Sequence, residues 1–183
     1  MSGNTHRETF AIRRIRANNA RVNPLTHLDE SGNARMVDVS AKPVQLREAV
    51  ASGEIRLCRE TLALIRKHGL AKGDVLAAAR LAGILAAKKT GDLIPLCHPL
   101  SLSHCEVNFR FPKTNDRIVI TASAKIAAQT GVEMEALTAV SIAALTIYDM
   151  CKAVDKTMRI SDVKLVSKTK NEASVIWPPR TEN

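Results

Sequence analysis

Three short polar segments, set in otherwise apolar sequence, contain the side chains best suited to acid–base or phosphate chemistry. The first is Lys72-Gly73-Asp74, in which a lysine precedes a residue that can cap a helix. Helix N-termini attract anions, and a neighbouring lysine adds a mobile cation. The segment therefore favours an anion site, although a solvated turn with a capping aspartate explains the same residues.

The second segment, Leu96-Cys97-His98-Pro99, places a histidine among apolar neighbours. A shielded histidine can serve as a general acid or base near neutral pH. Two alternatives stay open: a core histidine bonded to backbone, and a zinc site. The zinc ligands would be Cys97, His98, His104 and Cys105. Adjacent ligands point in different directions, and zinc ligands are normally spaced by two to four residues, which weighs against zinc.

The third segment belongs to a long predicted helix. Asp149 and Lys152 are three residues apart and so share a helix face. A surface ion pair of little energetic value explains this spacing too. Glu135 precedes Asp149 by 14 residues, which is roughly 21 Å along a helix axis. One small reacting centre within one chain cannot touch both carboxylates, so either they have separate tasks or the site combines two subunits.

The elements that must position these segments follow from periodicity and turn residues. Alternation of apolar and polar residues predicts strands over 36–40, 55–58, 105–111, 117–123 and 159–167. Helical composition and capping residues predict helices over 60–68, 74–89 and 132–154. Pro95 and Pro99 predict an ordered apolar loop over 92–100. This mixture indicates an α+β fold with helices on one face of an antiparallel sheet.

Length and charge narrow the class of function. The chain has 183 residues, of which 45% are hydrophobic and 25% charged, enough for one globular domain with tails. Its formal net charge of +9 predicts an anionic partner such as a nucleotide or phosphate. One Trp, one Tyr and three Phe provide little from which to build a base-stacking platform. We therefore expect no single-stranded nucleic acid partner.

Taken together, these segments resemble the MoaC family, the cyclic pyranopterin monophosphate synthases of molybdenum cofactor biosynthesis. The matching stretches are 36–42, 72–74, 92–100, 130–138 and 144–154. They run in family order, the resemblance covers about residues 25–169, and the matches of nine and eleven residues are highly specific.

The resemblance implies a ferredoxin-like fold, assembled as a hexamer of three dimers with sites between subunits. It implies a lyase that converts 3′,8-cyclo-7,8-dihydroguanosine 5′-triphosphate to cyclic pyranopterin monophosphate and releases diphosphate. The positions that match the family's catalytic residues are Asp149, Lys72 and Lys152. Those that match its substrate-contacting residues are Leu96, Cys97, His98, Met134, Glu135 and Lys168. We expect no metal-ligating residue and no resident cofactor; a magnesium ion accompanying the triphosphate is compatible with this expectation.

The sequence departs from the family pattern after its last predicted strand. The family usually reads Lys, Ser or Thr, Gly, Gly, Lys, Ser, Gly, whereas this chain reads Lys-Thr-Lys-Asn-Glu-Ala-Ser over 168–174. Glycine permits close backbone approach to a ligand, and Glu172 stands where a lysine would attract phosphate. Gln129 also stands where the family often has a basic residue. The departure predicts weaker binding of the phosphate end, or a segment turned away from the site, with Lys170 available to replace the lost cation.

The sequence also predicts the domain boundaries and the location of the protein, and it leaves two alternative functions open. We expect a basic N-terminal arm over 1–24, a MoaC-like catalytic domain over 25–177 and a C-terminal tail over 178–183. The first 25 residues hold no continuous apolar stretch and no cysteines form a CxxC pair, which predicts a cytoplasmic protein with free thiols and no membrane segment. Two alternative functions remain: a nucleotide-binding family member with weak turnover, and a basic nucleic-acid-binding protein.

Overall fold

The computed structural model describes residues 31–172, and the described part from Met36 onward forms one compact unit. The elements in chain order are β1 (Gln45–Arg56), α1 (Arg59–Arg66), α2 (Val75–Lys88), α3 (Thr90–Leu93), β2 (His104–Arg110), β3 (Arg117–Ala128), α4 (Glu133–Cys151) and β4 (Arg159–Glu172). The predicted arm 1–24 and tail 178–183 lie outside the described residues, so these domain boundaries stay predictions.

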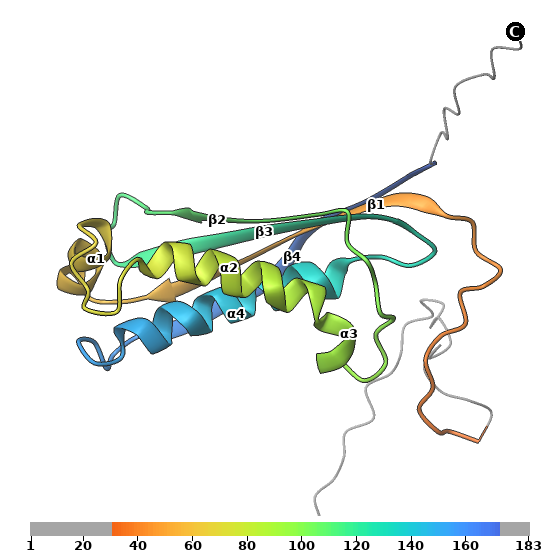
Figure 1. The fold of residues 1–183 in the computed structure, drawn as a ribbon, viewed down its shortest axis with the longest axis horizontal. Coiled ribbons are helices and arrows are strands. Elements are labelled where there is room, and N and C mark those ends of the chain that lie inside the picture. Colours follow the sequence, from red (N-terminus) through yellow and green to blue (C-terminus); the bar gives the residue numbers. More distant parts are fainter. Residues whose placement is uncertain (1–30, 173–183) are drawn as a thin grey trace, which may run out of the picture. The chain divides into compact units, whose positions relative to one another are not determined.

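The four strands form one antiparallel sheet in the order β2-β3-β1-β4. Helices α2 and α4 pack against each other and cover one face of this sheet (Figure 1). Strands β1 and β3 are central and lie under α4, whereas β2 and β4 form the two edges. This arrangement confirms the predicted α+β fold, and its strand order is consistent with a ferredoxin-like fold.

Small residues allow α2 and α4 to approach each other closely. A Cβ atom at Gly83 of α2 would lie 2.8 Å from the Ala139 carbonyl oxygen of α4. A glycine is therefore needed at this position in the middle of α2, since any side chain there would push the two helices apart. The alanines of α4 at 136, 139, 143 and 144 are fully buried beneath this contact. The position of α4 on the sheet is thus fixed along most of its length.

Helix α4 is the one helix among residues 31–172 that is long and apolar enough to cross a membrane by length and composition alone. The central helix of a packed core meets the same criteria. Here α4 contacts β1, β3 and α2, and eight of its residues are buried against them. We therefore interpret its apolar character as core packing.

Several of the predicted strands differ from the structure, and β3 continues to Ala128, beyond the predicted end at 123. Residues 36–40 form no strand; Val37 uses its carbonyl to bond His98, and Val39 bonds Lys42 across a turn. The strand predicted over 55–58 is the end of the longer β1, which passes through Gly53 without a break. Gly53 is required there because a Cβ atom would lie 2.8 Å from the Val140 side chain of α4. The last strand extends beyond residue 167 to Glu172.

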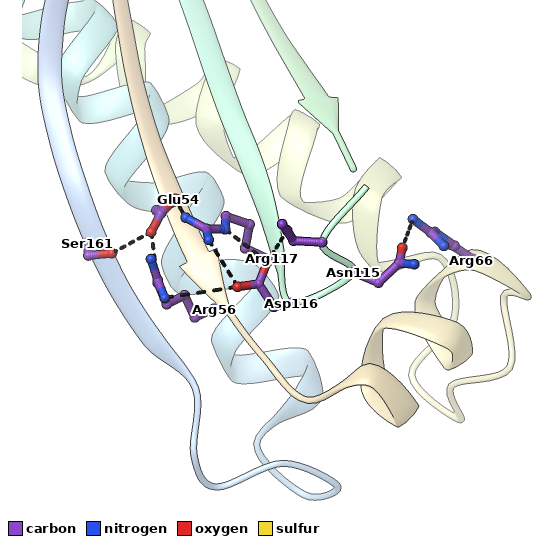
Figure 2. A network of polar contacts seen from close by, with 8 residues as sticks. Glu54, Arg56, Arg66, Asn115, Asp116, Arg117 and Ser161 are labelled. Atoms are coloured by element: carbon purple, nitrogen blue, oxygen red, sulfur yellow. Dashed lines mark hydrogen bonds and ion pairs between the residues drawn. The ribbon is translucent and has the colours of Figure 1, made fainter. Parts of the chain in front are cut away.

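A network of ion pairs joins three strands at the end of the sheet near α1 (Figure 2). Glu54 of β1 contacts Arg117 at 2.8 Å and Arg56 at 3.0 Å, and it accepts a hydrogen bond from the Ser161 hydroxyl of β4 at 3.2 Å. Arg117 also binds both carboxylate oxygens of Asp116 at 3.0 Å. We call these five residues the Glu54 network. It ties β1, β3 and β4 together on the face opposite the helices.

Candidate active site

The three residues predicted to be catalytic lie together at the C-terminal end of α4. Asp149 is in the last turn of α4, Lys152 caps that helix, and Lys72 comes from the loop between α1 and α2. Lys152 Nζ lies 2.6 Å from Asp149 Oδ1, and Lys72 Nζ lies 3.3 Å from Oδ2. Lys72 also donates to the Asp149 backbone carbonyl at 3.0 Å. We call these three residues the Lys–Asp–Lys cluster.

The charges within the Lys–Asp–Lys cluster reinforce one another. Hydrogen bonds from Lys152, and then from Lys72, lower the pKa of Asp149 below its ordinary value. The same carboxylate raises the pKa of Lys152. At neutral pH the cluster therefore holds a carboxylate between two ammonium groups. The side chains of Asp149 and Lys152 are 60% and 58% exposed, so a ligand can reach them.

The turn before α2 explains how Lys72 reaches α4. Gly73 adopts a φ of +87°, a conformation that L-residues rarely adopt, and Asp74 then begins the helix. The Asp74 side chain accepts hydrogen bonds from the backbone N–H groups of Leu76 and Ala77. Asp74 is thus a helix cap, as its sequence position predicts. The turn directs the Lys72 side chain toward Asp149 of α4.

A second group of predicted site residues lies at the opposite end of α4. Glu135 is only 3% exposed, and its Oε2 atom has no hydrogen-bond partner within the described chain. Burial, and then the neighbouring Glu133, raise the pKa of Glu135. The pKa of Cys97 is raised too, by burial and then by Glu135. Glu135 also lines a cavity of about 140 Å³ together with Lys88 and Asp92. The shifts favour the protonated forms of Glu135 and Cys97, and Glu135 borders the small cavity.

His98 is held by backbone, and its orientation follows from that bond. Its Nε2 atom lies 2.9 Å from the Val37 carbonyl oxygen. Because a carbonyl only accepts, Nε2 donates and Nδ1 is left as the proton acceptor of the neutral ring. Leu96 beside it is half-buried, and Met134, which precedes Glu135, is 38% exposed. No three His, Cys, Asp or Glu side chains within 31–172 converge as metal ligands, so the zinc alternative gains no support.

Basic side chains border two further cavities, of about 340 and 390 Å³, which share Arg47, Gly131 and Lys170. We call the cations that line them the basic basin: Lys42, Arg47, Lys168 and Lys170. Lys168 pairs with Glu133 at 3.0 Å. Arg47 donates to the backbone carbonyls of Ala128 and Gln129, and so closes the end of β3.

The basic basin contains two residues that sequence reasoning missed, and it places the altered segment after residue 167. Lys42 and Arg47 carried no local signal, although Lys42 ends one of the matching stretches. Arg47 and Lys170 are direct partners in the β1–β4 register. Residues 168–172 of the altered segment therefore continue β4 beside the basin, and Lys170 lies where a replacement cation could act.

One chain does not bring all the predicted residues to one place. Glu135 and Asp149 both belong to α4, separated by 14 residues, or roughly 21 Å. The Lys–Asp–Lys cluster lies at one end of this helix. Glu135, Met134 and the cavity beside them lie at the other, as does Lys168 through its bond to Glu133. The roles assigned to these residues stay predictions.

The α+β fold, the Lys–Asp–Lys cluster and the basic basin are the features expected of an enzyme that acts on an anionic small molecule. The MoaC family matches residues 36–171, and the chain belongs to this family.

Relatives named cyclic pyranopterin monophosphate synthase cover most of the chain. The Heliobacterium modesticaldum protein is 59% identical over 148 residues, which span 81% of this chain and 93% of the relative. The Chloroflexus aurantiacus protein is 62% identical over 146 residues, spanning 80% and 90%. The Rhodospirillum rubrum protein is 58% identical over 145 residues, spanning 79% and 87%.

Proposed function

We propose that this chain is a cyclic pyranopterin monophosphate synthase. It converts 3′,8-cyclo-7,8-dihydroguanosine 5′-triphosphate to cyclic pyranopterin monophosphate and diphosphate. The observation that carries the proposal is the Lys–Asp–Lys cluster, in which one ionised carboxylate lies between two cations and is open to a ligand. The high identity to synthases over most of the chain supports the same reaction.

The residues of the Lys–Asp–Lys cluster suit the proton transfers of this reaction. Rearranging a purine-derived ring requires protons to be removed and returned at several atoms. The lowered pKa of Asp149 keeps its carboxylate ionised and able to accept a proton at neutral pH. The raised pKa of Lys152 keeps its ammonium group protonated and able to donate. In the cyclisation, a sugar hydroxyl attacks the innermost phosphorus while the bond from that phosphorus to diphosphate breaks.

The basic basin is the proposed site for the phosphate end of the substrate. The departing diphosphate carries negative charge that cations must neutralise. Lys168 already pairs with Glu133, which reduces its net contribution. Lys170 has no acidic partner within the described residues and borders both cavities. We propose that Lys170 takes over the role that a lysine two residues later has in the family pattern.

We propose that each complete site combines residues of two subunits, within a homo-oligomer that we expect to be a hexamer. The fixed length of α4 keeps its two ends apart, so a neighbouring chain must bring them together. Apolar side chains on the outer side of the helix layer support such contacts. Leu81 and Leu85 of α2 are 63% and 57% exposed, and Leu145 of α4 is 52% exposed. We expect this enzyme to work in the cytoplasm, without a resident cofactor.

The activity is tested with the purified full chain and the cyclic GTP-derived triphosphate. We expect release of one diphosphate for each cyclic pyranopterin monophosphate formed, both measured in the same reaction. Tight binding with negligible diphosphate release would favour the weak-turnover alternative instead.

A subunit-mixing experiment tests the shared site. Asp149→Asn removes a residue at the C-terminal end of α4, and His98→Ala removes one from the α3–β2 loop, next to Pro99 of the Glu135 cavity. Each variant alone should have little activity. Random hybrid dimers should recover about a quarter of wild-type activity, because half the dimers are hybrids and each hybrid holds one intact site of two. The absence of recovery in purified hybrids, separated by a tag on one variant, would contradict a shared site.

A further inference from the structure

The loop after α4 contains a buried carboxylate that the proposed chemistry does not use. Asp155 is only 4% exposed. Its Oδ1 atom accepts hydrogen bonds from the backbone N–H of Thr157 at 2.8 Å and from the Thr157 hydroxyl at 2.7 Å. Its Oδ2 atom accepts another from the backbone N–H of Cys58 at 2.8 Å. Both carboxylate oxygens are therefore bound inside the protein.

The bond to Cys58 joins two distant parts of the chain. Cys58 immediately precedes α1, and its own side chain makes no capping hydrogen bond to that helix. An anion near a helix N-terminus is stabilised by the helix dipole and by the unpaired N–H groups there. Asp155 supplies that anion from the loop that follows α4. The start of α1 and the end of α4 are thereby held together.

Asp155 stays ionised over a wide pH range, so its hydrogen bond to Cys58 is kept over that range. Burial raises the pKa of Asp155, but the hydrogen bonds from Cys58 and Thr157 outweigh burial and lower that pKa to about 2. Asp155 also helps to raise the pKa of the buried Cys151 thiol to about 11, after the larger effect of burial. Across the physiological pH range, a carboxylate therefore faces a neutral thiol and three hydrogen-bond donors.

The two segments joined by Asp155 are those that carry the Lys–Asp–Lys cluster. The end of α4 holds Asp149 and Lys152, and the chain that continues from α1 toward α2 holds Lys72. Lys72 binds both the carboxylate and the backbone carbonyl of Asp149. Such a double contact requires the α1–α2 loop and the end of α4 to keep their relative position.

We propose that Asp155 is a positioning residue for the Lys–Asp–Lys cluster. Its carboxylate, bound to the backbone N–H of Cys58, holds the end of α4 against the start of α1 so that Lys72 stays in contact with Asp149. Asp155 acts through the backbone, since its bonds reach Cys58 and Thr157. The kinetic consequence rests on the proposed function, whereas the consequence for the cluster's geometry does not.

A proline substitution at Cys58 breaks this bond, because it removes the N–H donor and places the ring Cδ atom where the hydrogen pointed at Asp155. Cys58 has a φ of −69°, which proline adopts without strain, and it precedes the helix, where proline is tolerated. Cys58→Pro removes the N–H group together with the thiol. Cys58→Ala is the matched control, because it loses the same thiol and its 3.1 Å contact with Thr61 but keeps the N–H group. Asp116→Asn, in the Glu54 network, controls for general loss of stability.

Two measurements on the full-length variants test the positioning role. The pKa of Asp149, followed by carboxylate NMR, should rise part of the way toward its ordinary value in Cys58→Pro, because Lys72 withdraws while Lys152 keeps its contact from the end of the same helix. Turnover should fall about tenfold or more, with a smaller change in KM, since a small misplacement of catalytic groups is costly. Cys58→Ala and Asp116→Asn should leave both quantities near wild type.

The outcomes separate this inference from the proposed function. A Cys58→Pro protein with wild-type Asp149 pKa and turnover would overturn the positioning role. A wild-type protein that releases no diphosphate would overturn the proposed function, and the NMR titration would then decide the positioning role alone. If Cys58→Pro does not fold, Asp155→Asn replaces it, because the amide cannot accept from Cys58 and Thr157 together. The same rise in the Asp149 pKa is expected, and its absence would overturn the inference.

Discussion

Two groups of acidic and basic side chains lie on different parts of this molecule. They have similar composition, but one is mostly buried and the other is exposed. The Glu54 network joins three strands, and the Glu54 side chain is only 10% exposed (Figure 2). The Lys–Asp–Lys cluster lies at a helix end, and the Asp149 side chain is 60% exposed. Arg117 lowers the pKa of Glu54, and Lys152 lowers that of Asp149. A lowered carboxyl pKa alone therefore does not distinguish a structural group from a reactive one.

Structural and reactive groups differ instead in how accessible the carboxylate is to a ligand and in how many strands or helices the group connects. In the Glu54 network every carboxylate oxygen of Glu54 has a partner, so no ligand can bind without breaking a structural bond. In the Lys–Asp–Lys cluster the lysine side chains are about half exposed, 49% for Lys72 and 58% for Lys152, and a substrate can replace their contacts at low cost. The first group should thus determine stability and the second turnover.

The largest expected effect is on turnover, from Asp149→Asn. The amide cannot take up a proton, so kcat should fall by about 100-fold or more. The melting temperature and the assembly should stay near wild type, because an exposed ion pair contributes little to stability. Diphosphate-release kinetics and thermal unfolding measure the two effects, and near-normal turnover would show that Asp149 is not the acid–base residue.

The next effect is on stability, from Glu54→Gln. Removing the charge leaves Arg117 and Arg56 with weaker partners across β1 and β3, so the free energy of unfolding should fall by about 1–3 kcal/mol. Turnover of the folded enzyme should not change. Denaturant unfolding and kcat are measured on the same preparation. A loss of kcat with unchanged stability would show that the Glu54 network acts in turnover and not in stability.

Glu135 offers a third type of carboxyl group, which is buried and whose Oε2 atom has no hydrogen-bond partner among residues 31–172. Burial raises its pKa, so the folded state holds a proton that the unfolded state releases at lower pH. Stability should therefore fall as pH rises from the ordinary glutamate pKa through the raised one. Glu135→Gln should remove this part of the pH dependence and be the more stable protein at neutral pH. Unfolding free energies compared at pH 4 and pH 8 test this, and parallel curves for the two proteins would contradict it.

The smallest expected effect concerns the phosphate end. Lys170→Gln should raise KM a few-fold with little change in kcat, because an exposed cation mainly helps to bind the anionic end. Glu172→Lys should lower KM, and high salt should reduce both changes. Lys164→Gln is the matched control, since Lys164 lies on β4 outside the basic basin. Equal KM values for all four proteins would show that the end of β4 does not contact substrate.

Local sequence signals predicted the elements that carry repeated patterns. The apolar run of α4 and the capping position of Asp74 are both found in the structure. The alternation over 36–40 was misleading because five residues of alternation also occur in irregular backbone. The end of β4 was missed because residues 168–171 are exposed and polar, so no alternation marks an edge strand there. The resemblance to a known family provided the candidate site residues where spacing alone left alternatives.

Contacts between distant positions had no local signal. The bond from Cys58 to Asp155 spans 97 residues, and the partner of Glu54 on β3 is 63 residues away. Only the folded topology brings such groups together. The sequence also could not show that Glu135 would be buried while Asp149 stayed exposed, because both are acidic residues of the same mostly apolar helix.

The close contact of Gly83 with α4 has a consequence for how the family can diverge. An insertion of one turn in α4 would displace one end by about 5.4 Å and would break its match to α2. Insertions and deletions there should be strongly selected against. The end of β4 lies at a sheet edge and can exchange residues without moving the core. The departures at residues 170–172 fall in the part of the fold where sequence change is least costly.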